Sequence, residues 1–152
     1  LAEVLLEHPD EMARLRQSPG LLPTAVEEML RWESPVNMVA RTTVEPWRIG
    51  DLEVPPGEVL YCLIGAANHD PAAFVEPQRF DVGREPNAQL SFGGGVHYCV
   101  GAPLARLEAQ IAWSQLLRRW TRIEAAQPGA RPPWRPMINL RGLQALPIVG
   151  RR

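Results

Sequence analysis

The sequence has 152 residues, 16 Lys and Arg against 17 Asp and Glu, and two cysteines. This length is typical of one globular domain, the near-neutral charge gives no electrostatic case for nucleic-acid binding, and two cysteines exclude a disulfide-dense secreted scaffold. No apolar run approaches the roughly 20 residues of a membrane span, and we see no signal peptide. We therefore expect a cytoplasmic protein with no membrane partner. Sixteen prolines, about twice the average usage, predict a fold rich in loops.

Three helices are expected in the first part of the chain. Residues 1–6 are mostly apolar and indicate a helix that stops before Pro9, because the residue before a proline avoids the helical conformation. Pro9 itself suits the first position of a second, short helix. A third helix is predicted over residues 24–32, where Thr24 and Glu27 have the spacing of a capping box.

Short strands and a long irregular stretch follow. Residues 36–44, 47–49 and 59–64 are β-prone runs separated by turn signals, which resembles an antiparallel meander. Residues 67–98 carry no clear periodicity. An irregular stretch of this length inside a compact domain is unusual and tends to be functional.

The last third of the chain is predicted to hold one long helix and a hairpin. The helix runs from about Gly101 to Trp120, and its apolar positions keep the helical period: Val100, Leu104, Leu107, Ile111 and Leu116. In the tail from 128 to 152, Met137–Leu140 and Leu143–Val149 flank a turn at Arg141-Gly142 and indicate a hairpin. The fold class is therefore mainly α with small antiparallel β-sheets (α+β).

The most informative segment is Phe92–Gly101, which contains Cys99 just before the long helix. The unpaired N–H groups and the positive dipole end of a helix N-terminus favour a thiolate. Glycines allow backbone to approach a flat ligand closely. A lone cysteine can equally be a small buried hydrophobe, and this is our interpretation of Cys62. Since no His and Cys cluster has zinc spacing, a metal on Cys99 would take its other ligands from another molecule, as heme iron does.

Residues 92–105 resemble the cysteine-ligand loop of the cytochrome P-450 superfamily, F-G-x-G-x-H-x-C-x-G-x-x-L-A. All eight specified positions match: Phe92, Gly93, Gly95, His97, Cys99, Gly101, Leu104 and Ala105. The resemblance implies that Cys99 is the proximal ligand of a heme b iron and that Phe92 packs on the thiolate side. Gly93 and Gly101 belong to the same cofactor-binding loop. It also implies that His97 hydrogen-bonds a heme propionate; the alternative is a histidine on a surface loop.

Other positions support the resemblance. Glu28 and Arg31 form an E-x-x-R pair on one helix face, which by itself could be an exposed pair of little energetic value. In the family, such a pair joins an arginine of a P-x-R-F motif in a buried structural triad, which implies Arg79 here. Arg41 matches the family arginine that pairs with a heme propionate. Its alternative is an exposed strand arginine.

The resemblance also places two segments in the substrate pocket, one after the E-x-x-R helix and one at the tip of the C-terminal hairpin. Each residue could also be an ordinary core residue. The candidates are Val36, Asn37, Met38 and Val39 in the first segment, and Met137, Ile138, Asn139 and Leu140 in the second.

The resemblance covers residues 1–152 but only the C-terminal part of the family fold, so we interpret the chain as a partial domain. The family's acid–alcohol pair, A-G-x-[DE]-[ST], has no match, and we therefore expect no catalytic residue within this chain. Leu1 would lie near the C-terminal end of the distal helix that carries this pair in the family.

Two functions follow from the resemblance. The first is a soluble, bacterial-type heme-thiolate monooxygenase that inserts one oxygen atom of dioxygen into a small apolar organic substrate. Electron donation from the thiolate would favour O–O cleavage. The electron donor would be a ferredoxin or flavodoxin, bound on the side of Cys99, where Arg106 and Arg118 contribute. The alternative is a non-catalytic heme-binding remnant or an unstable fragment, because an incomplete domain leaves core surface exposed. We expect the isolated chain to be inactive.

Overall fold

The computed structural model describes residues 2–127, 129–130 and 132–152. Leu1 and Pro128, which begin the first predicted helix and the predicted tail, lie outside these residues. The helices are α1 (Ala2–Glu7), α2 (Pro9–Gln17), α3 (Leu22–Trp32), α4 (Ile64–Ala67) and α5 (Ala102–Arg119), with 3-10 turns at Pro19–Leu21 and Gly95–His97. The strands are β1 (Met38–Thr42), β2 (Trp47–Ile49), β3 (Leu52–Val54), β4 (Val59–Leu63), β5 (Arg122–Ala125) and β6 (Ile148–Arg151). The predicted mixture of helices and small antiparallel sheets is confirmed.

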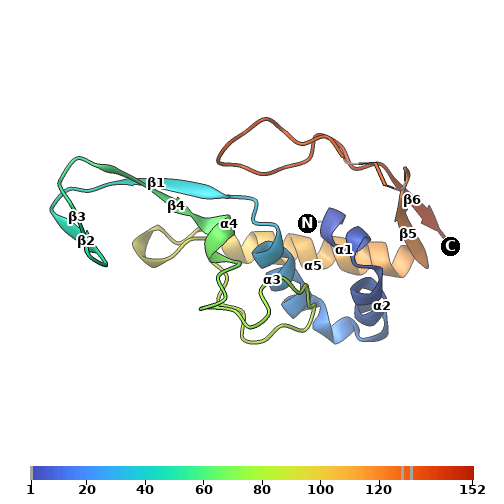
Figure 1. The fold of residues 1–152 in the computed structure, drawn as a ribbon. Helices are drawn as coiled ribbons and strands as arrows, with labels where there is room; N and C mark the ends of the chain where they lie inside the picture. The colour runs from blue at the N-terminus through green and yellow to red at the C-terminus, as the bar shows by residue number, and fades with distance from the viewer. Residues whose placement is uncertain (1, 128, 131) are drawn as a thin grey trace.

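The helices pack into one core beside the long helix α5 (Figure 1). α1, α2 and α3 contribute most of its buried side chains, and the irregular segment after α4 adds Phe80 and Val82. α5 contributes Trp113, with Ala109, Leu116 and Leu117 packed beside it. The irregular segment is therefore anchored to the helices, which allows a chain without regular structure to hold a fixed path.

The predicted capping box at α3 is wrong. The helix begins two residues earlier, at Leu22, with a proline in its first turn. The Thr24 hydroxyl lies 2.8 Å from the carbonyl oxygen of Leu21 and 2.7 Å from that of Val82, so it binds carbonyls and not the free N–H groups of the helix. The carboxylate of Glu27 is engaged elsewhere, as described below.

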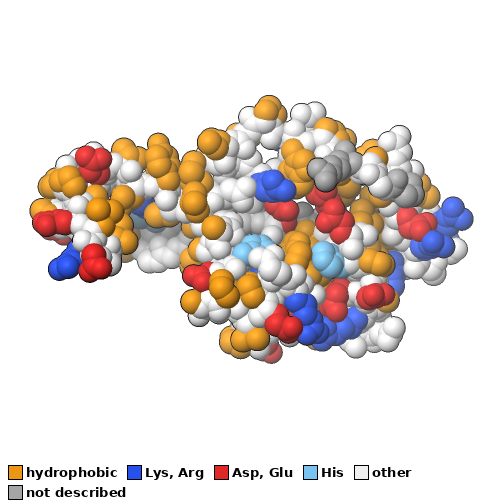
Figure 2. All heavy atoms as spheres, viewed as in Figure 1, with side chains coloured by type: hydrophobic (Ala, Val, Ile, Leu, Met, Phe, Trp, Pro, Cys, Tyr) orange, Lys and Arg blue, Asp and Glu red, His pale blue; other side chains and the backbone are white. Residues whose placement is uncertain are grey.

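The predicted antiparallel meander is also wrong in its pairing. β1 pairs with β4, in the register Met38 to Leu63 and Thr42 to Val59, and β2 pairs with β3 in a separate two-stranded sheet. One hairpin is thus nested inside the other in the chain. Both hairpins extend away from the helical core (Figure 1), and Figure 2 shows hydrophobic side chains gathered over them. The exposed apolar residues there include Trp47, Ile49, Leu52, Val59, Tyr61 and Leu63.

The C-terminal hairpin differs from its predicted pairing. Trp134 pairs with Leu143 in an isolated bridge, so that Met137–Leu140 forms the tip of a loop and not a strand. The last strand, β6, pairs with β5, from Arg122 opposite Arg151 to Ala125 opposite Ile148. The sequence pattern predicted a reversal of the chain here, but it placed the turn at Arg141-Gly142, which lies on the returning arm, and it did not identify the partner of the last strand.

The predicted apolar residues of α5 do not all face the core. Leu116 packs on the core, whereas Val100, Leu104, Leu107 and Ile111 are exposed, Val100 almost completely at 99%. The buried side of the helix is set by Ala102 and Trp113. Within the described residues, no helix has the length and apolar character to cross a membrane.

Candidate functional site

Cys99 lies on a tight loop that leads into α5. Gly93 and Gly95 adopt φ values of 74° and 62°, a region that side chains other than glycine rarely enter. The backbone N–H of Cys99 donates to the carbonyl oxygen of Phe92 at 2.9 Å, and the N–H of Ala102 donates to the carbonyl oxygen of Cys99 at 3.1 Å. The loop is thus closed on itself and tied to the first turn of α5, and it leaves the Cys99 thiol exposed.

Cys62 is not the buried core residue that we predicted. It lies on β4 opposite Val39, and its side chain is exposed. The cause is the isolated two-stranded sheet, because nothing among the described residues covers the face on which the side chain projects. An apolar strand sequence predicts burial only when a second layer packs against the strand.

Glu28 is completely buried on α3 and accepts hydrogen bonds from three side chains and one backbone N–H. Arg31 grips both of its carboxylate oxygens, with Nε to Oε2 at 2.7 Å and Nη2 to Oε1 at 2.9 Å. Arg84, Asn87 and the N–H of Asp81 add bonds of 3.0, 3.1 and 3.1 Å. A buried carboxylate is tolerated only when its charge and its oxygens are satisfied in this way.

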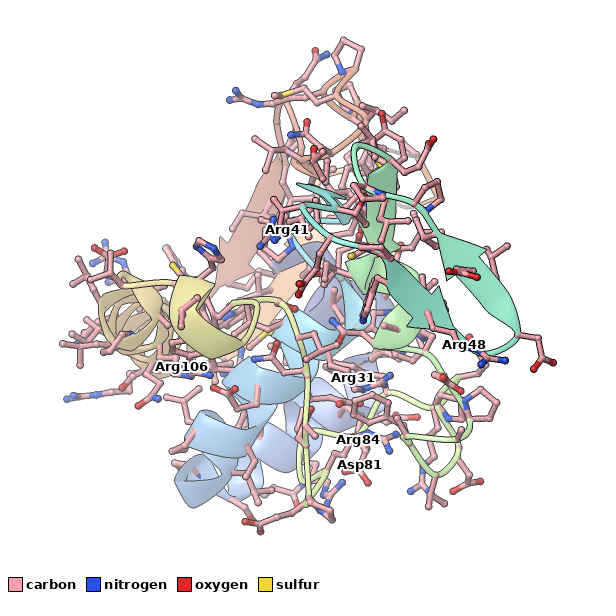
Figure 3. The ribbon with its side chains drawn as sticks, turned by 90° about the vertical axis from the view of Figure 1, so that its left-hand side faces the viewer. Arg31, Arg41, Arg48, Asp81, Arg84 and Arg106 are labelled. Carbon is pink, nitrogen blue, oxygen red and sulfur yellow. The ribbon has the colours of Figure 1, made fainter. Side chains whose placement is uncertain are left out.

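The second arginine at Glu28 is Arg84, not the predicted Arg79 (Figure 3). The guanidinium of Arg79 is exposed and pairs with Glu76 at 3.2 Å. Arg79 contributes its carbonyl oxygen instead, which accepts from Nη2 of Arg84 at 2.7 Å and of Arg31 at 3.4 Å. The P-x-R-F segment therefore takes part in the buried network through its backbone.

Two buried polar residues that the sequence analysis did not single out extend this network to the cysteine loop. Asn68 is completely buried; its carbonyl oxygen accepts from Nη1 of Arg31 at 2.8 Å, and its side-chain oxygen accepts from the N–H of Leu90 at 2.8 Å. The side chain of Asn68 also donates to the hydroxyl of Ser91 at 3.0 Å. Since Ser91 directly precedes Phe92, α3 and the start of the loop are connected without a gap. Asn68 begins the polar sequence Asn-His-Asp-Pro, which is the signal by which the sequence could have drawn attention to it.

Arg106, on the second turn of α5, bridges α3 and the cysteine loop. Its Nε and Nη2 donate to the two carboxylate oxygens of Glu27 at 2.6 and 2.9 Å, and its Nη1 donates to the Tyr98 hydroxyl at 2.8 Å. Burial raises the pKa of Glu27, but hydrogen bonds from Arg106 and Gln89 outweigh burial and lower this pKa below its ordinary value. The hydrogen bond to Glu27 likewise raises the pKa of Arg106. The two charges are thus paired at a partly shielded position, whereas we expected Arg106 on a partner-binding surface.

His97 and Arg41 are both exposed. His97 ends the 3-10 turn Gly95–His97, two residues before Cys99. Arg41 lies on β1, and Nη1 of its guanidinium donates to the carbonyl oxygen of Ala40 at 2.8 Å. In the view of Figure 3, Arg41 lies between the cysteine loop, drawn in yellow, and the strands of the hairpins. The guanidinium of Arg41 and the imidazole of His97 are therefore both accessible to a ligand.

The two candidate substrate segments lie together. Val36 pairs with Leu140 in an isolated bridge, and the N–H of Asn37 donates to the carbonyl oxygen of Asn139 at 3.0 Å. Met38 and Val39 continue into β1 and are half-buried, whereas Met137 and Ile138 at the loop tip are exposed. The structure thus brings together residues that are more than 100 positions apart in the chain.

A family model described as cytochrome P-450 matches residues 3–138. The chain belongs to the cytochrome P-450 family. It is 48% identical to cytochrome P-450 107B1 of Saccharopolyspora erythraea and 47% identical to the biotin biosynthesis cytochrome P-450 of Bacillus subtilis, in each case over 95% of this chain. It also matches the solved structure of cytochrome P-450 BioI in complex with hexadec-9Z-enoic acid ligated acyl carrier protein, with a TM-score of 0.94, 45% identity and coverage of 98% of this chain.

The chain spans 36% of the length of these curated relatives and 38% of that solved chain. The comparisons therefore establish the family and the fold of this region. The activity, substrates and partners of a whole protein are taken up as proposals below.

The residues around Cys99 fit a heme. Its thiol is a soft donor of the kind that ligates heme iron, and it is exposed on its loop. Val96 and Val100, which flank it, are 97% and 99% exposed, so a flat apolar ligand would remove both from water. Gly101 lies beside the thiol, because a Cβ at this position would be in van der Waals contact with the Cys99 sulfur at 3.8 Å.

Proposed function

We propose that this chain forms the thiolate-bearing part of a heme-dependent monooxygenase, with Cys99 as the axial ligand of the iron. The observation that carries the proposal is the exposed thiol of Cys99 on a loop whose ends are fixed by the Glu28 network and by α5. A loop held in this way presents one donor atom at one place. When bound, the heme supplies the redox chemistry that activates dioxygen.

The remaining loop and strand residues would hold the edge and face of the cofactor. Arg41 and His97 are accessible and carry or can carry a positive charge, which suits the two propionates of heme b. Phe92 and Gly93 lie at the start of the loop, where a ring and a glycine can border a flat ligand, and Gly101 lies at its end. These residues bind and orient the cofactor in the proposal. None of them is assigned a proton-transfer role.

The proposed reaction is insertion of one oxygen atom into a small apolar organic substrate. The paired segments Val36–Val39 and Met137–Leu140 would contribute part of its pocket, because they are adjacent and present apolar side chains that are half-buried in the first segment and exposed in the second. Relatives named for biotin biosynthesis and for an acyl-carrier-protein complex make fatty-acyl chains one substrate class to test. We further propose that residues 1–152 are part of one larger domain, and that the enzyme receives electrons from a ferredoxin or flavodoxin in the cytoplasm.

Heme binding by the 152-residue chain tests the ligand assignment. Purified chain is mixed with heme, reduced and exposed to carbon monoxide, and the difference spectrum is recorded. We expect the red-shifted band of thiolate-ligated heme, its loss in Cys99→Ala and its retention in Cys62→Ala, which removes the other exposed thiol. Retention of the band in Cys99→Ala would exclude Cys99 as the ligand. Heme binding without substrate turnover would favour the alternative of a non-catalytic heme-binding remnant for the isolated chain.

A further inference from the structure

Arg106 contacts three residues from two separate segments of the chain at once. Its guanidinium makes a two-point contact with Glu27 of α3, donates to the hydroxyl of Tyr98 in the cysteine loop, and lies over the Phe92 ring with Cζ 4.5 Å from the ring centroid. Figure 3 shows the residue between the yellow end of α5 and the blue helix α3. A planar guanidinium can do all of this together because it has five donors and a flat face.

Arg106 contacts Phe92 and Tyr98, the two residues on either side of the Cys99 backbone. Tyr98 is adjacent to Cys99 in the chain, and Phe92 accepts the backbone hydrogen bond of Cys99 at 2.9 Å. The Phe92 and Tyr98 rings also contact each other edge to face, with centroids 6.4 Å apart. One guanidinium therefore contacts two of the residues that hold the Cys99 backbone, and Ala102 is the third.

Glu27 holds Arg106 in this position. The two side chains are 24% and 29% exposed, so their ion pair is partly shielded from solvent. Gln89 donates to Oε2 of Glu27 at 2.9 Å, and its own side-chain oxygen accepts from the N–H of Ser91 at 2.6 Å. The carboxylate thus connects Arg106, through Gln89, with Ser91, the residue at which the network of Glu28, Arg31 and Asn68 also reaches the loop.

We propose that Arg106 is a positioning residue for the Cys99 loop, anchored by Glu27 and acting through Phe92 and Tyr98. It touches neither the sulfur nor a reacting group. That Arg106 helps to place the iron ligand rests on the proposed function. That Arg106 holds the Cys99 loop in one conformation does not require a heme. The guanidinium of Arg106 is engaged by Glu27 and Tyr98, whereas Arg118 on the same helix is exposed.

Amide hydrogen exchange in the heme-free chain tests the positioning role directly. The variants are Arg106→Gln, Arg106→Lys and Tyr98→Phe, and the matched control is Arg118→Lys, an exposed arginine on the same helix. We expect exchange in the peptide that covers residues 92–100 to accelerate roughly five- to tenfold in Tyr98→Phe, the ratio that corresponds to loss of one hydrogen bond, and further in Arg106→Gln. Arg106→Lys should rescue little, because a lysine keeps the charge but not the two-point contact. Peptides of α3 and the control variant should be unchanged.

Unchanged exchange over residues 92–100 in both Tyr98→Phe and Arg106→Gln would overturn the proposal, as would equal acceleration in Arg118→Lys. If Arg106→Gln does not fold, Tyr98→Phe decides, because it deletes a single hydroxyl. In heme-loaded chain, the Arg106 variants should lose part of the thiolate-type carbon-monoxide band to a form without thiolate ligation, and full retention of the band would overturn the ligand-presenting role. If the unmodified chain gives no such band, the proposed function fails. The positioning role of Arg106 is then still tested by the hydrogen-exchange measurement.

Discussion

The Nε of Arg84 donates to Oε1 of Glu28 at 3.0 Å, and this contact completes a buried ion network with Arg31. Arg84 is 10% exposed and Glu28 is completely buried, so neither charge can be satisfied by water alone. The network connects α3 with the irregular chain that leads to the cysteine loop. Its integrity therefore bears on both the stability of the fold and the placement of Cys99.

Replacement of Arg84 is expected to destabilise the chain far more than replacement of Arg79. Arg84→Met leaves part of the buried Glu28 charge uncompensated, which costs about 3 kcal/mol in the free energy of unfolding. Arg79→Met removes an exposed pair with Glu76 and should cost at most about 0.5 kcal/mol. Urea unfolding followed by circular dichroism measures both, and equal losses in the two variants would contradict the assignment of Arg84.

The side chain of Asn68 is expected to matter as much as a core hydrophobe. Asn68→Ala leaves the N–H of Leu90 without its acceptor and Ser91 without one donor, at about 2 kcal/mol in total. Asn139→Ala is the matched control, because the Asn139 side chain is exposed and only its carbonyl oxygen is used. The same unfolding measurement compares them. A stability of Asn68→Ala that matches the control would show that water replaces these bonds.

Heme is expected to protect one of the two thiols from chemical modification. In the heme-free chain both Cys62 and Cys99 are exposed and should react with a maleimide. After addition of heme, labelling of Cys99 should fall severalfold while labelling of Cys62 should not change. Peptide mass spectrometry reads the two sites separately, and parallel protection of both thiols would point to general burial or aggregation instead of ligation.

Glu27 is expected to make stability depend on pH in the acidic range. Its pKa in the folded chain lies below the ordinary value of 4.5, so the folded state favours the ionised carboxylate. The stability that this contributes is fully present above pH 4.5 and is lost as the pH falls through the lower, folded-state pKa. Unfolding measured from neutral pH downward should show a smaller acid loss in Glu27→Gln than in the unmodified chain. An identical acid loss in both would exclude a contribution from Glu27.

Gly150 is expected to tolerate no side chain. A Cβ there would lie 2.5 Å from the ring of Trp120, so Gly150→Ala should cost about 1–3 kcal/mol by overpacking. Gly20→Ala is the control, because a Cβ at that position meets nothing within 4 Å. Thermal unfolding distinguishes the two. An unaltered melting temperature in Gly150→Ala would mean that the Trp120 ring moves aside at no cost.

The sequence predicted helix boundaries correctly where they depend on neighbouring residues alone. The break before Pro9 and the start of α5 close to Gly101 follow from backbone sterics of the adjacent residues. The cysteine loop was identified because its glycines and Cys99 lie within ten consecutive positions. The partner of Glu28 was misassigned because Arg79 and Arg84 are five residues apart in irregular chain, where no periodicity indicates which side chain turns inward.

The sequence by itself determined the fold class, the family resemblance and the position of Cys99, because each depends on local patterns: the run of helical and β-prone segments for the fold class, and the contiguous cysteine-loop motif for the other two. Tertiary structure alone decided the nested pairing of β1 with β4, the meeting of Val36 with Leu140, and the attachment of Arg106 to Glu27. These are contacts between distant segments, and they depend on the path of the whole chain. Local propensity does not encode that path, because the free energy of such contacts arises only when the packed helices bring the segments together.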